Sequence, residues 1–574
     1  MSRSRRTKIN HTIQVRVDAR SDRFMAGAIT AVLLLLYLGT RSQVHNQCVD
    51  CTEYANRIQR GELKDLFQGG HLIYLWLLER IYRAVSSIFP EASVFTTAQT
   101  FNSLMSSMAV GVFYRVARTV IRDRWLSVVF SLILASSYHF WLFAIDVEVH
   151  APAIFLCFLT LHLALHTPIH APIWNFVGLG LLTAAAALFH VFGGVVVLPV
   201  LGLMLVKADH QAKVPVRLDT RHMRAIFVYG LTCAVLVLAA YLVVTIRALH
   251  LRNAGEIASW VLAFRSDVGY ADRSALPIDL TLALSAGAIV RALLGAVTWL
   301  AVPGLRELLL GVFAERCMSE ELYIVRNLGP VTASALTSLS AAAAGLLAVF
   351  MLVSARRFAV AVRRISRAAV GLAIWLVAYG VLIMYLDPGS YEHWGIYWMP
   401  ILILVGGAGL AQVASDEPGK KALVRGASLA LVIALFLGNI GNVLLLTSAE
   451  NDLYVHRLEW YRANTNSQDI VISSGGYKWT SYTSLYLQAR VVRLDSPSRT
   501  VSYLNFRRSL AEEISQTRAE GGRIFVMQDT LAPELCQARY GDWDLSFYEA
   551  FRRDMLPRLE CSQLDDVSIC QLEG

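Results

Sequence analysis

The chain has 574 residues, of which 55% are hydrophobic and only 17% are charged. Because a soluble protein carries about a quarter charged residues, this composition excludes a disordered chain, a coiled coil and an ordinary cytosolic enzyme. The net charge of +9 could indicate a nucleic-acid-binding protein, but the basic residues stand beside long apolar segments, where they mark the cytoplasmic ends of membrane spans. We therefore predict a polytopic α-helical membrane protein that binds no nucleic acid.

A membrane span needs about 20 mostly apolar residues. The first such segment, residues 24–40, follows a basic tail, residues 1–23, and no small-residue cleavage site comes after it. We therefore expect an uncleaved span and a cytoplasmic amino terminus. Ten further apolar segments bring the predicted number of spans to about eleven, within a transmembrane domain of residues 24–446. They are residues 97–116, 126–144, 149–165, 174–190, 192–206, 226–246, 333–353, 367–386, 396–414 and 426–446.

Four clusters of basic residues agree with this placement, because all of them fall on the cytoplasmic side if the spans number eleven. One more apolar segment, residues 283–303, conflicts with this placement. If it crossed the membrane, the basic cluster at residues 356–367 would lie outside. We therefore expect this segment to form an interfacial or re-entrant helix within a long external segment, residues 247–332. The basic clusters lie at residues 118–124, 207–224, 356–367 and 420–425.

The carboxyl-terminal part of the chain, residues 447–574, differs from the rest because it is charged and mixed in composition. With eleven spans it lies on the external, periplasmic side. Short β-rich runs at residues 469–473, 490–494 and 523–528 and a helical pattern at 508–520 predict an α/β domain. No glycine-rich nucleotide-binding motif follows any of these runs.

The first external loop, residues 41–96, places two acidic residues at the start of a short helix. Asp50 precedes Tyr54 and Ile58, which share one face of an interfacial helix, and Glu53 lies about one turn from Asp50. A carboxylate on a constrained external loop indicates a catalytic group. Aspartate is also a common helix N-cap, so a purely structural role is equally compatible with this position.

The turn between the third and fourth predicted spans contains a second acidic group. Asp146 and Glu148 form a D-x-E pair, and His150 follows them. Two carboxylates beside an imidazole could bind a divalent cation or position a hydroxyl group. The alternative is a solvated turn with an ordinary charge pair.

We expect Asp50 and the turn of Asp146 and Glu148 to meet in one outward-facing chamber, and other positions could line it. His71 and Tyr74 begin an aromatic segment that we expect to lie along the membrane. His190, at the end of the fifth predicted span, could face the cavity or be a hydrogen-bonded structural histidine. Glu392 lies on the short external turn ahead of the tenth span.

The cysteines are too few for a disulfide scaffold, with eight in the chain. Cys48 and Cys51 flank Asp50, which raises the possibility of a redox pair. We favour a local disulfide that stiffens the loop, or pairing with cysteines of the external tail. Those cysteines are Cys536, Cys561 and Cys570.

With these loops in this order, the chain resembles the GT-C superfamily of membrane glycosyltransferases. Its layout is similar to that of the aminoarabinose transferases, protein O-mannosyltransferases and lipopolysaccharide sugar transferases. Those enzymes have a catalytic acid in a D-x-x-x-Y-A-like pattern in the first external loop. They have a second acidic site between spans three and four. The resemblance covers residues 24–206 well and the rest only by hydropathy. The matching residues are Asp50, Tyr54, Ala55, His71, Tyr74, Asp146 and Glu148.

The resemblance implies that a hexose or pentose moves from a polyprenyl-phosphate-linked donor to a glycan, lipid or protein acceptor at the external face of a bacterial-type inner membrane. It implies that Asp50 is the general base, with Glu53 as the alternative, and that the anomeric configuration is inverted. Asp146 and Glu148 would orient the acceptor or bind a divalent cation, Mg²⁺ or Mn²⁺. The other substrate-binding candidates are Tyr54, His71, Tyr74, His150, His190 and Glu392.

One departure from the resemblance concerns the donor phosphate. Relatives in the aminoarabinose-transferase branch place a lysine just ahead of the second amphipathic helix, where this chain has Gly69, Gly70 and His71. The positive charge would therefore come from His71 or from an arginine of the long external segment, of which the candidates are Arg265, Arg273 and Arg326.

The alternative function is a membrane transporter or lipid-carrier flippase in which the acidic loops form a gating site. Such proteins commonly contain internal repeats with broken helices at matching positions. We find no convincing repeat, and the acidic residues cluster at the external face, so we favour the transferase.

Overall fold

The chain forms two compact units. The first contains residues 1–41, 57–313 and 325–445, and the second contains residues 42–56, 314–324 and 446–574. Within them, the computed structural model describes residues 3–44, 50–205, 219–267, 277–312, 321–322, 324–325, 328–362, 367–416, 418–451, 453–473, 483, 487, 489–494, 503–527, 545–564 and 567–572.

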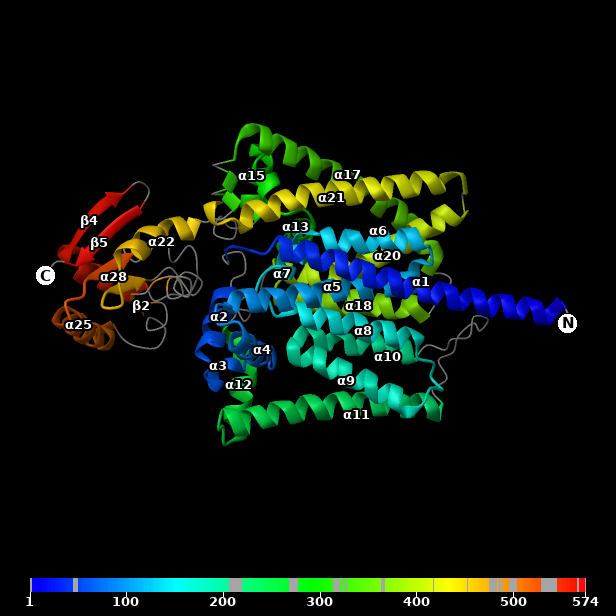
Figure 1. The fold of residues 1–574 in the computed structure, drawn as a ribbon, viewed down its shortest axis with the longest axis horizontal. Coiled ribbons are helices and arrows are strands. Elements are labelled where there is room, and N and C mark those ends of the chain that lie inside the picture. Colours follow the sequence, from blue (N-terminus) through cyan, green and yellow to red (C-terminus); the bar gives the residue numbers. More distant parts are fainter. Residues whose placement is uncertain are drawn as a thin grey trace. The chain divides into compact units, whose positions relative to one another are not determined.

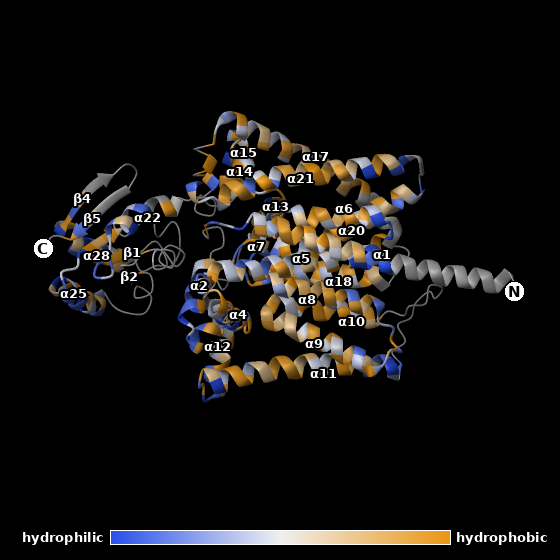
Figure 2. Cartoon of the chain, viewed as in Figure 1, coloured by the Kyte–Doolittle hydropathy of each residue, from blue (hydrophilic) through white to orange (hydrophobic). Residues whose placement is uncertain are grey.

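The first unit is a bundle of helices, most of which run side by side (Figure 1). Hydrophobic residues cover these helices along most of their length, as expected for segments that face lipid and one another (Figure 2). In chain order the elements are α1 (Arg3–Gly39), α2 (Cys51–Arg60), α3 (Leu63–Leu66), α4 (Tyr74–Ile88), α5 (Val94–Ile121), α6 (Arg124–Ser136), α7 (Tyr138–Ala144), α8 (His150–His166), α9 (Ile173–Phe189), the 3-10 helix η1 (Val191–Val196), α10 (Val197–Leu205), α11 (Thr220–Val243), the π-helix η2 (Val244–Ala248), α12 (Ala254–Asp267), α13 (Ile278–Leu294), α14 (Val297–Leu300), α15 (Pro303–Val312), α17 (Pro330–Val362), α18 (Arg367–Leu386), α19 (Tyr391–His393), the π-helix η5 (Trp394–Trp398), α20 (Met399–Asp416), η6 (Pro418–Lys420) and α21 (Lys421–Thr447). Of these elements, α2 and α21 extend into the second unit, which contains residues 51–56 and 446–447.

The helices confirm a polytopic α-helical membrane protein. Among the described residues, seven helices are long and apolar enough to cross a membrane, and α6 with α7, bent by 69°, would form an eighth. Three shorter apolar helices coincide with the predicted spans at residues 149–165, 174–190 and 192–206. All eleven predicted segments thus coincide with apolar helices, although helix length supports only seven or eight crossings.

The apolar segment at residues 283–303 is not one continuous helix. α13 ends immediately before Gly295, whose φ of 68° lies in the left-handed region that favours glycine, and two short helices follow. On α21, the side-chain amide of Asn439 donates hydrogen bonds to the main-chain oxygens of Leu293 and Ser136, both at 2.7 Å. Ser136 is the last residue of α6, so one amide satisfies carbonyl groups at the ends of two interrupted helices.

Close contact between helices of the bundle depends on glycine. A Cβ atom added at Gly111 on α5 would lie 2.2 Å from Thr30 Oγ1 and 3.1 Å from the main-chain oxygen of Ala26, both on α1. A Cβ atom at Gly180 on α9 would lie 2.9 Å from the main-chain oxygen of Tyr229 on α11. Because lipid is as apolar as the helix surfaces, such close packing supplies much of the association energy of membrane helices.

The second unit contains a five-stranded sheet in the order β2-β1-β3-β5-β4. Strands β1 (Ile470–Ser473), β2 (Arg490–Arg493) and β3 (Ile524–Met527) are parallel, and β4 (Leu559–Leu564) and β5 (Val567–Leu572) form an antiparallel hairpin that pairs with β3. The predicted α/β fold is confirmed, with the three predicted strands close to their expected positions; the hairpin was not predicted. The helices are α22 (Leu453–Asn464), α25 (Tyr503–Ala519) and α28 (Leu545–Met555).

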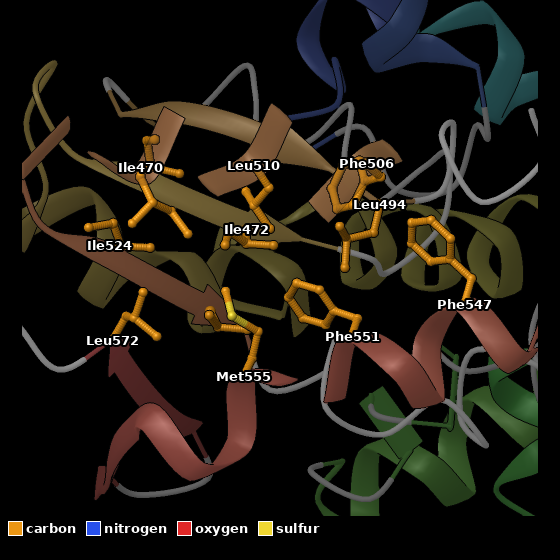
Figure 3. Close-up of a cluster of buried hydrophobic side chains, with 12 residues drawn as sticks. Ile470, Ile472, Leu494, Phe506, Leu510, Ile524, Phe547, Phe551, Met555 and Leu572 are labelled. Carbon is orange, nitrogen blue, oxygen red and sulfur yellow. The ribbon is translucent and has the colours of Figure 1, made fainter. Parts of the chain in front are cut away.

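Helices cover both faces of this sheet. On one face, α25 and α28 pack against side chains of β1, β3 and β5 in the apolar cluster of Figure 3. On the other face, Leu458 and Tyr461 of α22 pack with Val471 and Phe525. Alternate residues of one strand therefore enter different cores, as the two-residue period of a strand requires. The cluster of Figure 3 contains Ile470, Ile472, Leu494, Phe506, Leu510, Ile514, Ile524, Val526, Phe547, Phe551, Met555 and Leu572.

The described cysteines resolve part of the predicted pairing. Cys561 and Cys570 are opposite each other on β4 and β5 and form a disulfide, so the expectation that they pair with the first loop is wrong. Cys51 is also disulfide-bonded, whereas Cys48 and Cys536 lie outside the described residues. The other described cysteines are free thiols: Cys157 is buried in α8, and Cys233 is half-buried in α11.

Candidate functional site

The acidic turn between α7 and α8 is buried rather than solvated. Asp146 and Glu148 are 0% and 4% exposed, so the alternative of an ordinary solvated charge pair is wrong. Each carboxylate accepts a hydrogen bond from the next backbone N–H, Asp146 Oδ1 from Val147 at 2.8 Å and Glu148 Oε2 from Val149 at 2.7 Å. Burying two carboxylates costs several kcal/mol unless they are compensated, which indicates a functional reason for the turn.

Asn102 of α5 fixes the backbone of this turn. Its side-chain amide donates to the main-chain oxygens of Asp146 and Glu148, both at 2.8 Å. Its side-chain oxygen accepts a hydrogen bond from the hydroxyl of Tyr74 at 3.2 Å. Tyr74, a predicted substrate-binding residue, is fully buried. Its hydrogen bond to Asn102 connects the start of α4 to the acidic turn. Sequence reasoning missed Asn102, although a polar residue within an apolar span is a signal for function.

The segment before α4 is attached to the connection between α9 and η1. Backbone hydrogen bonds join Ile73 N to Leu188 O at 3.1 Å and Val191 N to Gly70 O at 2.9 Å. His71 lies between these bonds, and its ring stacks on that of His190 with 6.4 Å between centroids. Two candidate residues from distant parts of the sequence are therefore brought together.

His71 is neutral in this setting. Burial, together with the positive charge of Arg57, lowers the pKa of His71 to about 3. At neutral pH the His71 ring therefore does not supply a positive charge for the donor phosphate. This result removes one of the two alternatives offered by the sequence. The other candidates are not tested, because Arg273, Arg326 and the side chain of Arg265 lie outside the described residues.

Three buried histidines meet at the centre of the site. His150 at the start of α8, His190 after α9 and His393 at the end of α19 are 3%, 4% and 6% exposed. Each offers a ring nitrogen, and these atoms lie within 4.8 Å of one another. The hydroxyl of Tyr397 lies 3.1 Å from His150 Nδ1 and 3.4 Å from His190 Nδ1, and Glu148 Oε2 lies 3.9 Å from His150 Nε2. The acidic turn and the histidines are therefore one continuous polar site.

Sequence reasoning named the turn that contains His393 but selected its neighbour Glu392. The structure buries His393, whereas Glu392 is only half-buried. Arg291 of α13 was also missed: it is 7% exposed, and its guanidinium carbon lies 4.0 Å from the ring centroid of Tyr391. An arginine inside the apolar segment 283–303 was a usable signal, because charges within such segments are costly and mark function.

The first acidic loop belongs to the second unit. Asp50 is half-buried just before α2, and its side chain accepts a hydrogen bond from the hydroxyl of Tyr54 at 3.1 Å. Glu53 is buried in the first turn of α2, where a helix N-terminus stabilises a carboxylate. Because the two acidic loops lie in different units, the prediction that they share one chamber stays a prediction.

No family model and no curated protein matches this sequence. Two crystal structures of ArnT from Cupriavidus metallidurans are similar to it, one bound to undecaprenyl phosphate (TM-score 0.52) and one in the apo state (TM-score 0.53). Each is 11% identical and covers 96% of this chain, which in turn covers 97% and 98% of those chains. The chain has a GT-C-like fold. The similarity confirms the fold that the resemblance to the GT-C superfamily implied.

Proposed function

We propose that the chain is a lipid-carrier-dependent glycosyltransferase that moves a sugar from a polyprenyl-phosphate-linked donor to an envelope acceptor at the external membrane face. The observation that carries the proposal is the buried acidic turn of Asp146 and Glu148, fixed by Asn102 inside a GT-C-like fold. The similarity to ArnT bound to undecaprenyl phosphate supports a polyprenyl-phosphate partner.

In this mechanism a carboxylate takes the proton of the acceptor hydroxyl as that hydroxyl attacks the anomeric carbon, and the lipid phosphate leaves. Asp50 is the proposed base and Glu53 the alternative. A single displacement inverts the anomeric configuration. Tyr54, which hydrogen-bonds Asp50, positions the carboxylate.

The donor phosphate needs a positive charge close to the site. Because His71 is neutral, Arg57 and Arg291 are the proposed sources among the described residues. Guanidinium groups suit phosphate because they donate two parallel hydrogen bonds. Asp146 and Glu148 would orient the acceptor hydroxyl or bind Mg²⁺ or Mn²⁺, which prefer carboxylate oxygens.

Two assays test the proposal. Mass spectrometry of envelope glycans from cells with and without the gene identifies the sugar and the acceptor. Purified protein in liposomes should then release polyprenyl phosphate as the acceptor gains sugar. Asp50→Asn should lower the rate of transfer by roughly 10²–10⁴-fold. Asp219→Asn, at an exposed N-cap of α11 that asparagine can replace, serves as the control.

Full transfer by the folded Asp50→Asn protein would overturn the proposed base. Translocation of the intact lipid donor across the liposome membrane without sugar release would instead support a flippase.

A further inference from the structure

The three-histidine cluster has the geometry of a metal site. We propose that His150, His190 and His393 bind one divalent transition-metal ion, with Zn²⁺ as the preferred ion. The proposal concerns metal binding alone, so it stands whether or not the chain transfers a sugar. It gives His150 and His190 a different role from the substrate contact that the sequence predicted.

The separation of the nitrogen atoms fits a tetrahedral ion after a small adjustment. Zinc–nitrogen bonds of 2.0–2.1 Å at tetrahedral angles place two ligand nitrogens about 3.4 Å apart. The three ring nitrogens already lie within 4.8 Å of one another, so the largest separation needs to shrink by at most about 1.4 Å. Small rotations of the rings about their side-chain bonds supply such a movement.

The ligand types select the metal. Imidazole nitrogen suits Zn²⁺, Co²⁺, Ni²⁺ and Cu²⁺, whereas Mg²⁺ and Mn²⁺ prefer the oxygen ligands offered by Asp146 and Glu148. Three histidines with an open fourth position is also the ligand set of one class of catalytic zinc sites. The histidine site is therefore chemically distinct from the acidic pair, although Glu148 is close enough to contribute negative charge.

Neighbouring hydroxyl groups hold the rings in place. Ser390 Oγ lies 2.7 Å from His393 Nδ1, and the Tyr397 hydroxyl bridges His150 and His190. Hydrogen bonds of this kind orient the ligands of a metal and raise its affinity. The ligands come from α8, the α9–η1 connection and α19, so a bound ion would cross-link three separate segments.

The test uses full-length protein in detergent, purified through a tag without histidine and stripped with a chelator. After equilibration with Zn²⁺ and removal of free ion, elemental analysis should find about one equivalent per chain. His393→Gln should abolish this binding, and Ser390→Ala should lower the affinity by about 10–100-fold. The control is His162→Gln, because His162 and His166 form a separate pair on α8 with 4.6 Å between ring centroids.

Stoichiometric zinc binding by the folded His393→Gln variant would overturn the proposal, as would loss of binding in His162→Gln or the absence of stoichiometric binding to the wild-type chain. If His393→Gln fails to fold, X-ray absorption spectroscopy of the zinc-loaded wild-type chain decides the matter. Three imidazole ligands support the site. Fewer imidazoles, or sulfur, reject it.

Discussion

Tyr74 donates its hydroxyl hydrogen to the side-chain oxygen of Asn102 across 3.2 Å. Asn102 in turn uses its amide for the two main-chain oxygens of the acidic turn. One asparagine therefore connects the start of α4 to the backbone that carries Asp146 and Glu148. The positions of these carboxylates therefore depend on a side chain that bonds to the main chain of their residues and not to the carboxylates themselves.

Replacing this asparagine should damage both stability and activity. In Asn102→Leu, two buried carbonyl groups lose their donor, at a cost of about 1–3 kcal/mol each. We expect a lower free energy of unfolding in detergent and loss of sugar transfer. Asn175→Leu on the exposed start of α9 is the control, and wild-type behaviour of Asn102→Leu would contradict the assigned role.

The hydrogen bond from Tyr74 can be measured separately. Tyr74→Phe removes one buried hydroxyl group and should lower the free energy of unfolding by about 0.5–1.5 kcal/mol. Combined with Asn102→Leu in a double-mutant cycle, it should show a coupling energy of at least about 0.5 kcal/mol, because the two side chains are in direct contact. Strictly additive effects would show that the bond contributes nothing.

Arg291 should affect binding of the donor. Its guanidinium group is buried against Tyr391, and one charge-assisted hydrogen bond contributes about 1.5–3 kcal/mol. Arg291→Gln should therefore raise the KM for the lipid-linked donor by roughly 10–100-fold, with a smaller effect on the KM for the acceptor. Arg252→Gln, at an exposed position, is the control; an unchanged donor KM in Arg291→Gln would assign the phosphate contact elsewhere.

His71 should make stability depend on pH. Its pKa of about 3 in the folded chain lies below the 6.5 of a free histidine, so between these values the unfolded chain binds a proton that the folded chain does not. The stabilising contribution is therefore complete above pH 6.5 and is lost as the pH falls toward 3, by about 1.4 kcal/mol per pH unit.

Unfolding measured across this range should show a shallower slope in His71→Gln than in the wild-type chain. His170→Gln, at an exposed position, is the matched control. An identical slope in His71→Gln and wild type would show that His71 is not neutral in the folded chain.

The general base can be assigned by comparing two isosteric variants. If Asp50 takes the proton, Asp50→Asn should lower kcat by roughly 10²–10⁴-fold, whereas Glu53→Gln should have a smaller effect. Each variant should also be followed as a function of pH, because loss of the base removes the acidic limb of the kcat profile. The opposite ranking would transfer the role to Glu53.

Much of the fold follows from local signals. Each of the eleven apolar segments coincides with a helix, because a run of about 20 apolar residues has few alternatives to a membrane helix. β1 and β3 were visible as short apolar runs that are fully buried. The β4–β5 hairpin was missed because its strands mix polar and apolar residues, and only their pairing at the edge of the sheet defines them.

The site was less visible in the sequence. The two acidic loops stood out because charge is rare on short external turns. His190 and His393 are 203 residues apart in the sequence, and only the packing of the segments that carry them brings them to one point. No spacing rule links such positions, so the histidine cluster could not be derived from the chain alone.

Asn439 has a consequence for how the bundle can move. Its amide holds the carbonyl ends of both α6 and α13, so straightening either bend would break one of these hydrogen bonds and leave a buried carbonyl group without its donor. One side chain therefore resists movement at both bends. Replacing this side chain with leucine would loosen both at once.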